Sequence, residues 1–295
     1  MTPGRPADGR GTLFVVATPI GNLGDVTQRA LDVLRAVPLI AAEDTRVTAR
    51  LLARFTIPTR SVSFHARNTG RRLPELLAHL RGGQDIALVT DAGTPGVSDP
   101  GEELVRAWAA EGGRVEAIPG ASAVMAAIAV SGVGGPRWSF EGFLPRSGRD
   151  RRERLTRIAA DERGCVVFEA PTRIAATIRD LATACGEGRT AAVCRELTKL
   201  HEQVVRAPLG TLAAMVDRGE IPARGEFVLV LGPSAPRIVD RDGDREAARA
   251  EVERLVTAGA ARGDAARRVA AATGISRRHL YRRPEAEPGH PGRAR

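Results

Sequence analysis

Short apolar runs recur along the first half of the chain, and a segment with helical periodicity separates each run from the next. The runs cover residues 13–17, 39–42, 86–89 and 115–118. Alternation of buried strands with helices is typical of βαβ units, in which the strands pair in parallel. The pattern therefore predicts an α/β fold built on a mostly parallel sheet.

Polar residues mark where two of the helices are expected to begin. Asp25 with Gln28, and Asp99 with Glu102, have the spacing of a capping box. Pro100 would occupy the first helical position, where its missing N–H costs nothing. We expect helices to start directly after Asp25 and Asp99.

The second half repeats the alternation and then changes in composition. Runs at 165–168, 191–194 and 226–232 predict further strands, and the glycine-rich segment 132–138 is the best candidate for a hinge. After Pro236 helical spacing appears at 245–256 and 264–272, and residues 273–283 resemble the second helix of a helix-turn-helix with Ser276 as N-cap. Since 295 residues exceed the usual size of one domain, we predict a disordered tail at 1–11, α/β domains at 12–133 and 134–235, a helical module at 236–283 and a disordered tail at 284–295.

The chain is strongly basic. Lys and Arg number 44 against 35 acidic residues, which gives a formal charge of +9. This balance favours a polyanionic partner, although an arginine-rich composition with a solvated surface would give the same charge. Lys199 is the single lysine, and all other residues counted here as Lys or Arg are arginines. The two side chains differ, because lysine carries a flexible ammonium and arginine a planar guanidinium.

Cysteine usage and hydropathy narrow the class of protein. Cys165, Cys185 and Cys194 are odd in number and form no CxxC pair, which argues against a disulfide framework or a zinc ribbon and favours a reducing compartment. No stretch approaches the ~20 apolar residues of a membrane span, and no signal peptide is apparent. We therefore expect a cytoplasmic protein that binds no membrane and, because its histidines are scattered, no metal.

Six polar clusters follow closely after apolar runs. They are TPIGN at 18–22, EDTR at 43–46, DAGTPGVSDPG at 91–101, PGAS at 119–122, EAPTR at 169–173 and RELTK at 195–199. The carboxyl ends of parallel strands meet at one edge of a sheet, where ligands bind. The clusters therefore predict one shared cleft, in which glycines let the backbone approach a ligand and prolines stiffen the turns.

Taken singly, most of these clusters have plainer explanations. TPIGN is a common kind of turn sequence, and Glu43 and Asp44 would equally serve to cap the following helix. DAGTPGVSDPG is more informative, because two Asp, two Thr or Ser and three Gly in eleven residues exceed what a connecting loop needs. GxGxxG and P-loop motifs are absent, so the cleft does not have the sequence of an NAD or ATP site.

The order and spacing of longer motifs are similar to one known family. TPIGNLGD, AAEDTR, DAGTPGVSDPG, PGASA, FEGFLPR, RELTKLHE and RGEFVLV resemble the ribosomal RNA small subunit methyltransferase I family, which belongs to the tetrapyrrole methylase fold family. The resemblance covers about residues 12–232, and the tail resembles the helical module that closes many members. Two departures stand out: the family usually has Ser-Pro-His-Arg where this chain has APTR at 170–173, and Glu-His where it has Ala66 and Arg67.

The resemblance implies two α/β domains with S-adenosylmethionine in the cleft between them. It implies an enzyme that transfers a methyl group to the ribose 2′-oxygen of a decoding-centre cytidine in 16S rRNA, with the rRNA or the 30S subunit as partner and a homodimer as the common assembly. The residues implied to bind the cofactor are Pro19, Asp91, Gly93, Pro95, Val97, Ser98, Ala121, Ser122, Phe168, Leu197 and Phe227.

The chemistry of methyl transfer suggests roles for the polar residues. A sulfonium methyl is already activated, so the enzyme must align the hydroxyl and help to remove its proton. We predict that Asp44 or Glu43 accepts or orients the proton, and that Lys199 lowers the pKa of the hydroxyl. Asn22 and Arg46 are expected to position the ribose and its phosphate. The arginines expected to bind the RNA substrate are Arg46, Arg146, Arg149, Arg151 and Arg195, together with the C-terminal module.

Two other functions remain open at this point. A methyltransferase acting on a tetrapyrrole or corrinoid precursor would share the fold, although the Arg-rich segment 143–157 argues against it. A DNA-binding regulator that uses 276–283 as a recognition helix is the alternative that is not an enzyme. It leaves the six polar clusters unexplained.

Overall fold

The computed structural model describes residues 9–234, 243–273, 275 and 277–280. The chain divides into two compact units, residues 1–234 and 235–295. Within the first unit, the predicted boundary between residues 133 and 134 stays a prediction. Elements of the first unit are β1 (Thr12–Val16), a 3-10 helix (Leu23–Asp25), α1 (Gln28–Ala36), β2 (Leu39–Ala42), α2 (Thr45–Arg54), β3 (Ser61–Ser63), α3 (Thr69–Arg81), β4 (Ile86–Val89), α4 (Glu102–Ala110), β5 (Arg114–Ile118), α5 (Ala123–Ser131), β6 (Trp138–Phe143), α6 (Gly148–Ala160), β7 (Gly164–Glu169), α7 (Ile174–Cys185), β8 (Thr190–Arg195), β9 (Gln203–Pro208), α8 (Leu209–Asp217) and β10 (Phe227–Leu231).

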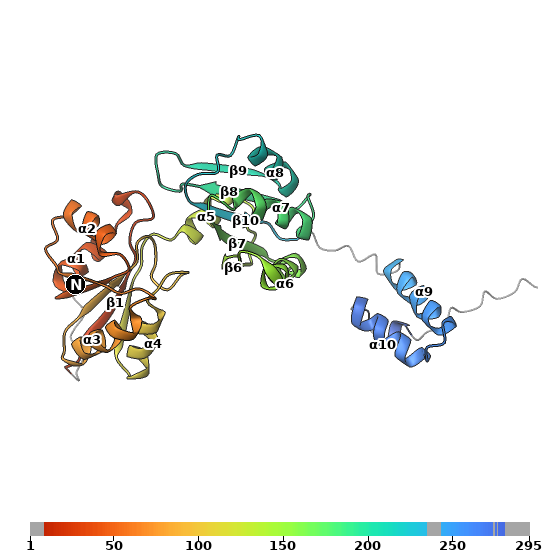
Figure 1. The fold of residues 1–295 in the computed structure, drawn as a ribbon, viewed down its shortest axis with the longest axis horizontal. Coiled ribbons are helices and arrows are strands. Elements are labelled where there is room, and N and C mark those ends of the chain that lie inside the picture. Colours follow the sequence, from red (N-terminus) through yellow and green to blue (C-terminus); the bar gives the residue numbers. More distant parts are fainter. Residues whose placement is uncertain (1–8, 235–242, 274, 276, 281–295) are drawn as a thin grey trace, which may run out of the picture. The chain divides into compact units, whose positions relative to one another are not determined.

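The first five strands form a parallel sheet in the order β3-β2-β4-β1-β5. Figure 1 shows β1 of this sheet with α1, α2, α3 and α4 around it. The two faces of the sheet follow from the alternation of side chains along each strand. In β1, Phe14 and Val16 pack in a core with residues of α1 and α2, whereas Leu13 packs in another core with residues of α3 and α4. The predicted parallel α/β sheet is thus confirmed.

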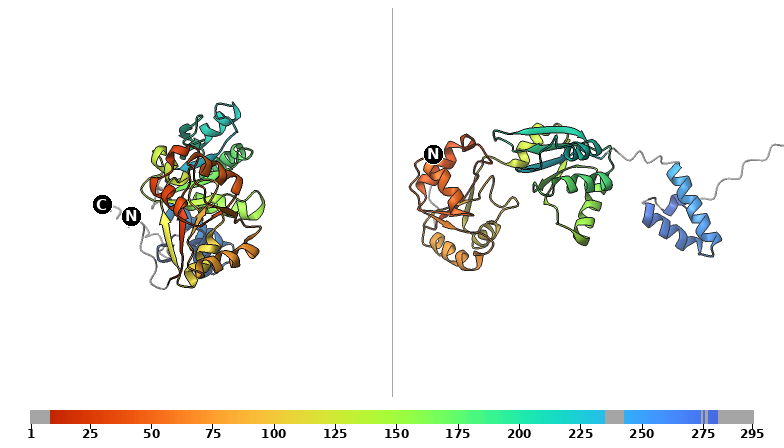
Figure 2. Two further views of the ribbon diagram at one scale, coloured as in Figure 1. Left: turned by 90° about the vertical axis from the view of Figure 1, so that its left-hand side faces the viewer. Right: turned by 45° about the horizontal axis from the view of Figure 1, so that its top comes forward.

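A second sheet has the order β6-β7-β10-β8-β9, and it is mixed rather than mostly parallel. β6 and β7 are parallel, while β10 runs antiparallel between β7 and β8, and β9 is antiparallel to β8. The reason is the short connection from β8 to β9, since a crossover to a parallel strand needs a dozen or more residues. Residues of α6, α7 and α8 form one core with the sheet, and α5 packs on the other face (Figure 2).

Both predicted helix starts are wrong, because each helix begins two residues later than expected. α1 is capped by Thr27, whose hydroxyl accepts the N–H of Ala30, and Asp25 lies in the preceding 3-10 helix. α4 follows Gly101, which has a φ of 127°. A Cβ at Gly101 would lie 2.9 Å from a methyl carbon of Leu88 in β4, so the close approach to the sheet requires glycine here rather than an Asp99 capping box.

The second unit contains α9 (Gly243–Thr257), α10 (Arg262–Thr273) and α11 (Arg277–Leu280). The two longer helices confirm the helical spacing expected at 245–256 and 264–272. Its core includes Ala248, Val252, Ala265, Val269 and Leu280. The expected N-cap Ser276 and the tail at 284–295 lie outside the described residues. In the described part of the chain, no helix is both long and apolar enough to span a membrane.

Candidate active site

Loops from three strands of the first sheet are bonded to one another at its carboxyl edge. Thr18, after β1, exchanges backbone hydrogen bonds of 2.8 and 3.1 Å with Gly93, after β4. The Thr18 hydroxyl donates to the Thr90 carbonyl at 3.1 Å. Thr94 in turn donates to the carbonyl of Ala121, after β5, at 3.3 Å. These bonds hold the TPIGN, DAGTPGVSDPG and PGAS clusters together.

The turn from β8 to β9 reaches the same edge from the second sheet. The Asn22 N–H donates to the Thr198 hydroxyl at 3.1 Å. A Cβ on Gly21 would lie 2.5 Å from Cγ of Lys199, so only glycine permits this approach without a shift. Glu196 and Thr198 both have positive φ, 52° and 66°. Non-glycine residues held in that region cluster at functional sites, where contacts elsewhere compensate for the strain.

The converging loops enclose a cavity of about 350 Å³, called here the main cavity. Six of the residues predicted to bind the cofactor line it: Gly93, Val97, Ser98, Ser122, Phe168 and Phe227. Twelve further residues complete its wall: Ile20, Ala92, Thr94, Asp99, Ala123, Val124, Phe143, Glu169, Ala170, Pro171, Glu226 and Val228. The predicted shared cleft is confirmed as a place where loops of both sheets meet.

A second cavity of about 400 Å³, the adjacent cavity, shares Ile20, Ala92 and Glu226 with the main one. Pro19, Asp91 and Lys199 line it. The remaining residues that the resemblance implied for the cofactor lie elsewhere. Pro95 is buried, Ala121 accepts the Thr94 hydroxyl through its carbonyl, and Leu197 lines a pocket of only about 30 Å³.

Sequence reasoning missed two parts of the main cavity wall. Phe143 lies edge-on to Phe168 with 5.6 Å between ring centroids, and FEGFLPR was the motif that pointed to it. Glu169 is buried, and its carboxylate accepts Thr177 at 2.5 Å, Arg173 at 3.0 Å and the Ala170 N–H at 2.8 Å. This set of bonds fixes the loop at Ala170 and Pro171 against the cavity.

Carboxylates gather around Thr90, at the end of β4. The Thr90 hydroxyl donates to Glu43 at 2.6 Å, and Asp91 accepts the Asp44 N–H at 3.0 Å. Burial raises the pKa of Asp99 to about 6, the nearby charges of Glu43 and Asp91 add to this, and a Thr90 hydrogen bond opposes it. Burial also raises the pKa of Asp91. Asp99, the third residue that sequence reasoning missed, forms no ion pair in the described part of the chain.

Asp44 is placed differently from its neighbours. It is the N-cap of α2 and accepts the Arg46 N–H at 2.8 Å, while Arg46 also bonds its carboxylate at 2.5 Å. The hydrogen bonds from the Arg46 side chain and backbone lower the pKa of Asp44 to about 2. A carboxylate held in this way is a weak base at neutral pH, so the geometry favours the helix-cap explanation of Asp44 over the predicted catalytic role.

Lys199 forms ion pairs with Glu196 at 2.9 Å and with Glu226 at 3.0 Å. Burial lowers the pKa of Lys199, but the hydrogen bonds and charges of Glu196 and Glu226 outweigh it, so that its pKa lies above the ordinary value. The side chain is therefore a cation at neutral pH. Such a group can polarise a hydroxyl in the adjacent cavity, but it cannot accept a proton.

The arginines predicted to bind RNA separate into two groups. Arg151 is buried and donates to Asp180, Thr177 and the Pro145 carbonyl, each at 2.9 Å. Arg195 is buried and donates to the carbonyls of Arg224 and His201. Both side chains hold the protein's own loops in place, so for these two the geometry argues against the predicted contact with RNA. Arg46, Arg146 and Arg149 are exposed.

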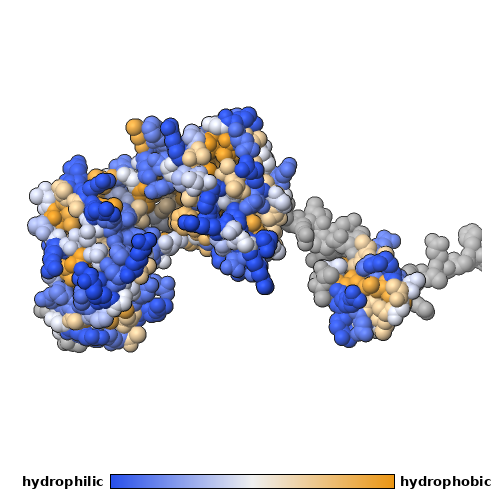
Figure 3. Space-filling model, in the orientation of Figure 1, coloured by the Kyte–Doolittle hydropathy of each residue, from blue (hydrophilic) through white to orange (hydrophobic). Residues whose placement is uncertain are grey.

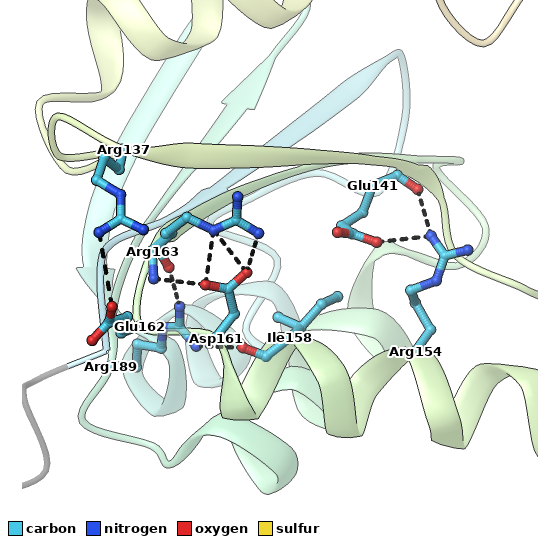
Figure 4. A network of polar contacts seen from close by, with 8 residues as sticks. All are labelled: Arg137, Glu141, Arg154, Ile158, Asp161, Glu162, Arg163 and Arg189. Atoms are coloured by element: carbon cyan, nitrogen blue, oxygen red, sulfur yellow. Dashed lines mark hydrogen bonds and ion pairs between the residues drawn. The ribbon is translucent and has the colours of Figure 1, made fainter.

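Other arginines, in α6 and in the loops next to β7 and β8, are also held by internal partners (Figure 4). Arg154 bonds Glu141 at 2.8 Å, and Arg163 bonds Asp161 at 2.7 Å. Arg189 is buried and donates to the carbonyls of Ile158 and Arg163. Much of the positive charge in this part of the chain is therefore engaged in bonds that stabilise the fold.

The chain is similar to known methyltransferases along most of its length. Residues 12–213 match the family described as Tetrapyrrole (Corrin/Porphyrin) Methylases. Ribosomal RNA small subunit methyltransferase I of Synechocystis sp. is 47% identical over 272 residues, covering 92% of this chain and 96% of that protein. The protein of the same name from Xylella fastidiosa is 44% identical, with coverage of 92% and 98%.

Solved structures share the fold at much lower identity. A cobalt precorrin-4 methyltransferase of cobalamin biosynthesis has a TM-score of 0.60 at 19% identity, covering 79% of this chain and 98% of that one. A diphthine synthase has a TM-score of 0.58 at 15% identity, with coverage of 75% and 90%. Fold and sequence thus agree, and the chain belongs to the ribosomal RNA small subunit methyltransferase I family, within the tetrapyrrole methylases.

Proposed function

We propose that this protein transfers a methyl group from S-adenosylmethionine to the ribose 2′-oxygen of a decoding-centre cytidine in 16S rRNA, and that it acts in the cytoplasm. The observation that carries the proposal is the 47% identity, over 92% of the chain, to a protein named as a small-subunit rRNA methyltransferase. The site supports it, because loops of both sheets meet at a cavity large enough for a small molecule.

The main cavity fits S-adenosylmethionine in size and chemistry. Its volume of about 350 Å³ lies within the range of small-molecule sites, and Phe143 and Phe168 provide apolar walls for an aromatic ring. The carboxylates of Asp99 and Glu226 suit a ligand that carries positive charge. Gly93, Val97, Ser98, Ser122, Phe168 and Phe227 are the residues we propose to hold it.

When bound, S-adenosylmethionine supplies a methyl group on a sulfonium, and its transfer to oxygen leaves a neutral thioether. The protein must then orient the ribose hydroxyl and take its proton. We assign the proton to the Asp99 carboxylate, because Asp99 lines the main cavity and its pKa of about 6 suits a base that works near pH 7. Glu43 is a second candidate for the proton acceptor, since it accepts a hydrogen bond from Thr90, which is also bonded to Asp99.

Lys199 and Asn22 complete the site in this proposal. The Lys199 ammonium lies in the wall of the adjacent cavity, where it stabilises negative charge that develops on the ribose oxygen. Asn22 is exposed, and its side chain accepts the Gly24 N–H at 2.9 Å, which orients it at the start of the 3-10 helix. A ribose in the adjacent cavity would lie next to the main cavity, since the two share wall residues.

We also propose that the protein forms a homodimer through α5. This helix has no charged residue; Val124 and Ala127 are buried, while the side chains of Met125 and Val130 are 56% and 38% exposed. Exposed apolar side chains on an otherwise packed helix are typical of an interface between copies. Light scattering should give twice the mass of the chain, and Met125→Glu with Val130→Glu should give the mass of one chain. A single-chain mass for the unaltered protein would contradict the dimer.

The function is tested by locating the transferred methyl group. The protein is incubated with methyl-labelled S-adenosylmethionine and small subunits that lack the modification, and the RNA is digested to nucleosides for mass spectrometry. We expect label on the ribose of one cytidine. Label on a base, or label accepted by a porphyrinogen but not by RNA, would contradict the proposal and favour a tetrapyrrole methyltransferase. Tight binding to duplex DNA without methyl transfer would favour the regulator.

A further inference from the structure

Positive charge is concentrated at one edge of the first sheet. Residues 45–73 contain seven arginines and neither Asp nor Glu. This segment includes α2, the outer strand β3 and the first turn of α3. We call it the basic edge, and its arginines are Arg46, Arg50, Arg54, Arg60, Arg67, Arg71 and Arg72.

Three of these arginines form a row along α2. Arg46, Arg50 and Arg54 are four residues apart, so they share one side of the helix with a rise of about 6 Å between them. All three are exposed, whereas Thr48 and Leu51 are buried on the opposite side. In Figure 3, which has the orientation of Figure 1, strongly hydrophilic residues lie among hydrophobic ones on the part of the surface that carries α2.

Most of this charge has no acidic partner. Arg46 pairs with Asp44 and Arg72 with Glu75. The others that are exposed and form no ion pair in the described part of the chain are Arg50, Arg54, Arg60, Arg67 and Arg71. On α6, by contrast, Arg149, Arg151 and Arg154 are each paired with a carboxylate. The basic edge thus has more arginines without an acidic partner than the Arg-rich segment 143–157.

The basic edge reaches the candidate active site at two points. Arg50 lines the adjacent cavity together with Asp91 and Lys199. Arg67 lines a third cavity of about 340 Å³, whose wall also includes Glu43 and Asp91. An RNA strand that lies along this edge would therefore enter the site beside Asp91, which lines both of these cavities.

The turn that carries Arg67 is built to hold one conformation. Asn68 accepts the His65 N–H at 2.9 Å and donates to the Ser63 carbonyl at 3.1 Å. The Arg67 N–H donates to Nδ1 of His65 at 3.2 Å, and Thr69 donates to the His65 carbonyl at 3.1 Å. A guanidinium presented from a fixed turn loses less conformational freedom when it binds a phosphate.

We propose that the basic edge binds the phosphate backbone of the RNA strand that carries the target nucleotide, with Arg50 and Arg67 at the entrances to the site. The inference rests on the proposed function and adds to it where the RNA lies. Arginines that neutralise phosphates release condensed counterions, so the affinity they provide falls steeply with salt. The slope of log affinity against log salt concentration therefore measures the number of phosphate contacts.

The test compares two triple variants with the same change in charge. Arg50→Gln, Arg67→Gln and Arg71→Gln are combined in the basic edge, and Arg146→Gln, Arg152→Gln and Arg157→Gln on or beside α6. All six side chains are exposed and lack an ion pair in the described part of the chain. Filter binding to unmodified small subunits is measured from 50 to 200 mM salt. Melting temperature and S-adenosylmethionine affinity by calorimetry check that each variant is folded.

If three single-strand phosphate contacts are lost, the slope of log affinity against log salt should fall by about 2. The affinity of the unaltered protein would then decrease about 20-fold more than that of the basic-edge variant across this range. A basic-edge variant that keeps the slope and affinity of the unaltered protein would overturn the inference, whatever the α6 variant does. If the unaltered protein neither binds nor methylates the subunit, the proposed function itself fails.

Discussion

Replacement of Asp99 by Asn should move activity and stability in opposite directions. Asn has nearly the same size as Asp but cannot ionise. Asp99 lines the main cavity, faces the charges of Glu43 and Asp91, and has no cationic partner in the part of the chain that the structure describes. The protein therefore holds a carboxylate where its charge is unfavourable, and the substitution removes that charge.

The size of the stability change follows from the pKa of Asp99. A rise from the ordinary value of 3.8 to about 6 corresponds to about 3 kcal/mol, at ~1.36 kcal/mol per pH unit. Because the carboxyl group is partly exposed, solvent screening reduces this to about 1–2 kcal/mol. The folded state binds the proton more tightly than the unfolded state, so the cost is absent below pH 3.8, grows as pH rises and is complete above about pH 6.

Asp99→Asn should therefore raise the free energy of unfolding by about 1–2 kcal/mol at pH 7.5, and by about half as much at pH 5. Methyl transfer should meanwhile fall by about 100- to 10,000-fold, the usual contribution of a general base. In the unaltered protein, kcat/KM should rise with pH up to about 6 and then level, and the variant should lack this rise. Urea denaturation and single-turnover methylation measure the two effects.

Asp44→Asn is the matched control, because hydrogen bonds from Arg46 lower the pKa of Asp44 to about 2. Its ionised form stabilises the fold above pH 3.8, and that contribution is lost as pH falls toward 2. The control should lose stability at pH 7.5 and keep most of its activity. Full turnover and an unchanged pH profile in Asp99→Asn would refute the role of Asp99, and the same measurements on Glu43→Gln would then test the second candidate.

Three further substitutions test other parts of the site and fold. Lys199→Met should reduce kcat by about 10-fold or more without loss of cofactor affinity in calorimetry, because it removes the cation that stabilises a developing oxyanion. Phe168→Ala should weaken S-adenosylmethionine binding by about 10-fold, since an aromatic wall of the main cavity is lost. Arg151→Met should lower the free energy of unfolding by about 2–3 kcal/mol, because Asp180 and Thr177 lose a buried partner, whereas exposed Arg152→Met should change it by less than about 0.5 kcal/mol.

The sequence predicted the elements whose apolar residues recur with the period of a strand or a helix. The buried strands of the first sheet and the longer C-terminal helices follow directly from the spacing of apolar residues. β3 escaped notice because Ser61–Ser63 is short, polar and at the sheet edge. The mixed order of the second sheet was not predicted either, since periodicity locates a strand but does not say which strand it pairs with.

In the candidate site, too, the sequence could not show which residues are partners, and this affected the charged residues most. Motif order placed the loops correctly, but it could not say which guanidinium has an internal partner. Arg151 looked like part of an RNA-binding segment, yet its partners Thr177 and Asp180 lie 26 and 29 residues away in sequence. Arg50 was not predicted to belong to the site, and Arg67 was named only as a departure from the Glu-His pair of the family. Their significance comes from the absence of acidic residues around them in the sequence and from the cavities that they line.

The arrangement of charge explains why two sheets are needed for one site. The carboxylates around Thr90 all come from the first sheet, while the cation of Lys199 comes from the turn between β8 and β9. Lys199 and Asp91 line the adjacent cavity together, so this pair of opposite charges needs a loop from each sheet. Gly21 permits the turn to approach, and the bond from Asn22 to Thr198 fixes its position. The strained backbone at Glu196 and Thr198 is thus compensated by contacts that set the distance between opposite charges, and the site depends on the two sheets meeting at this turn.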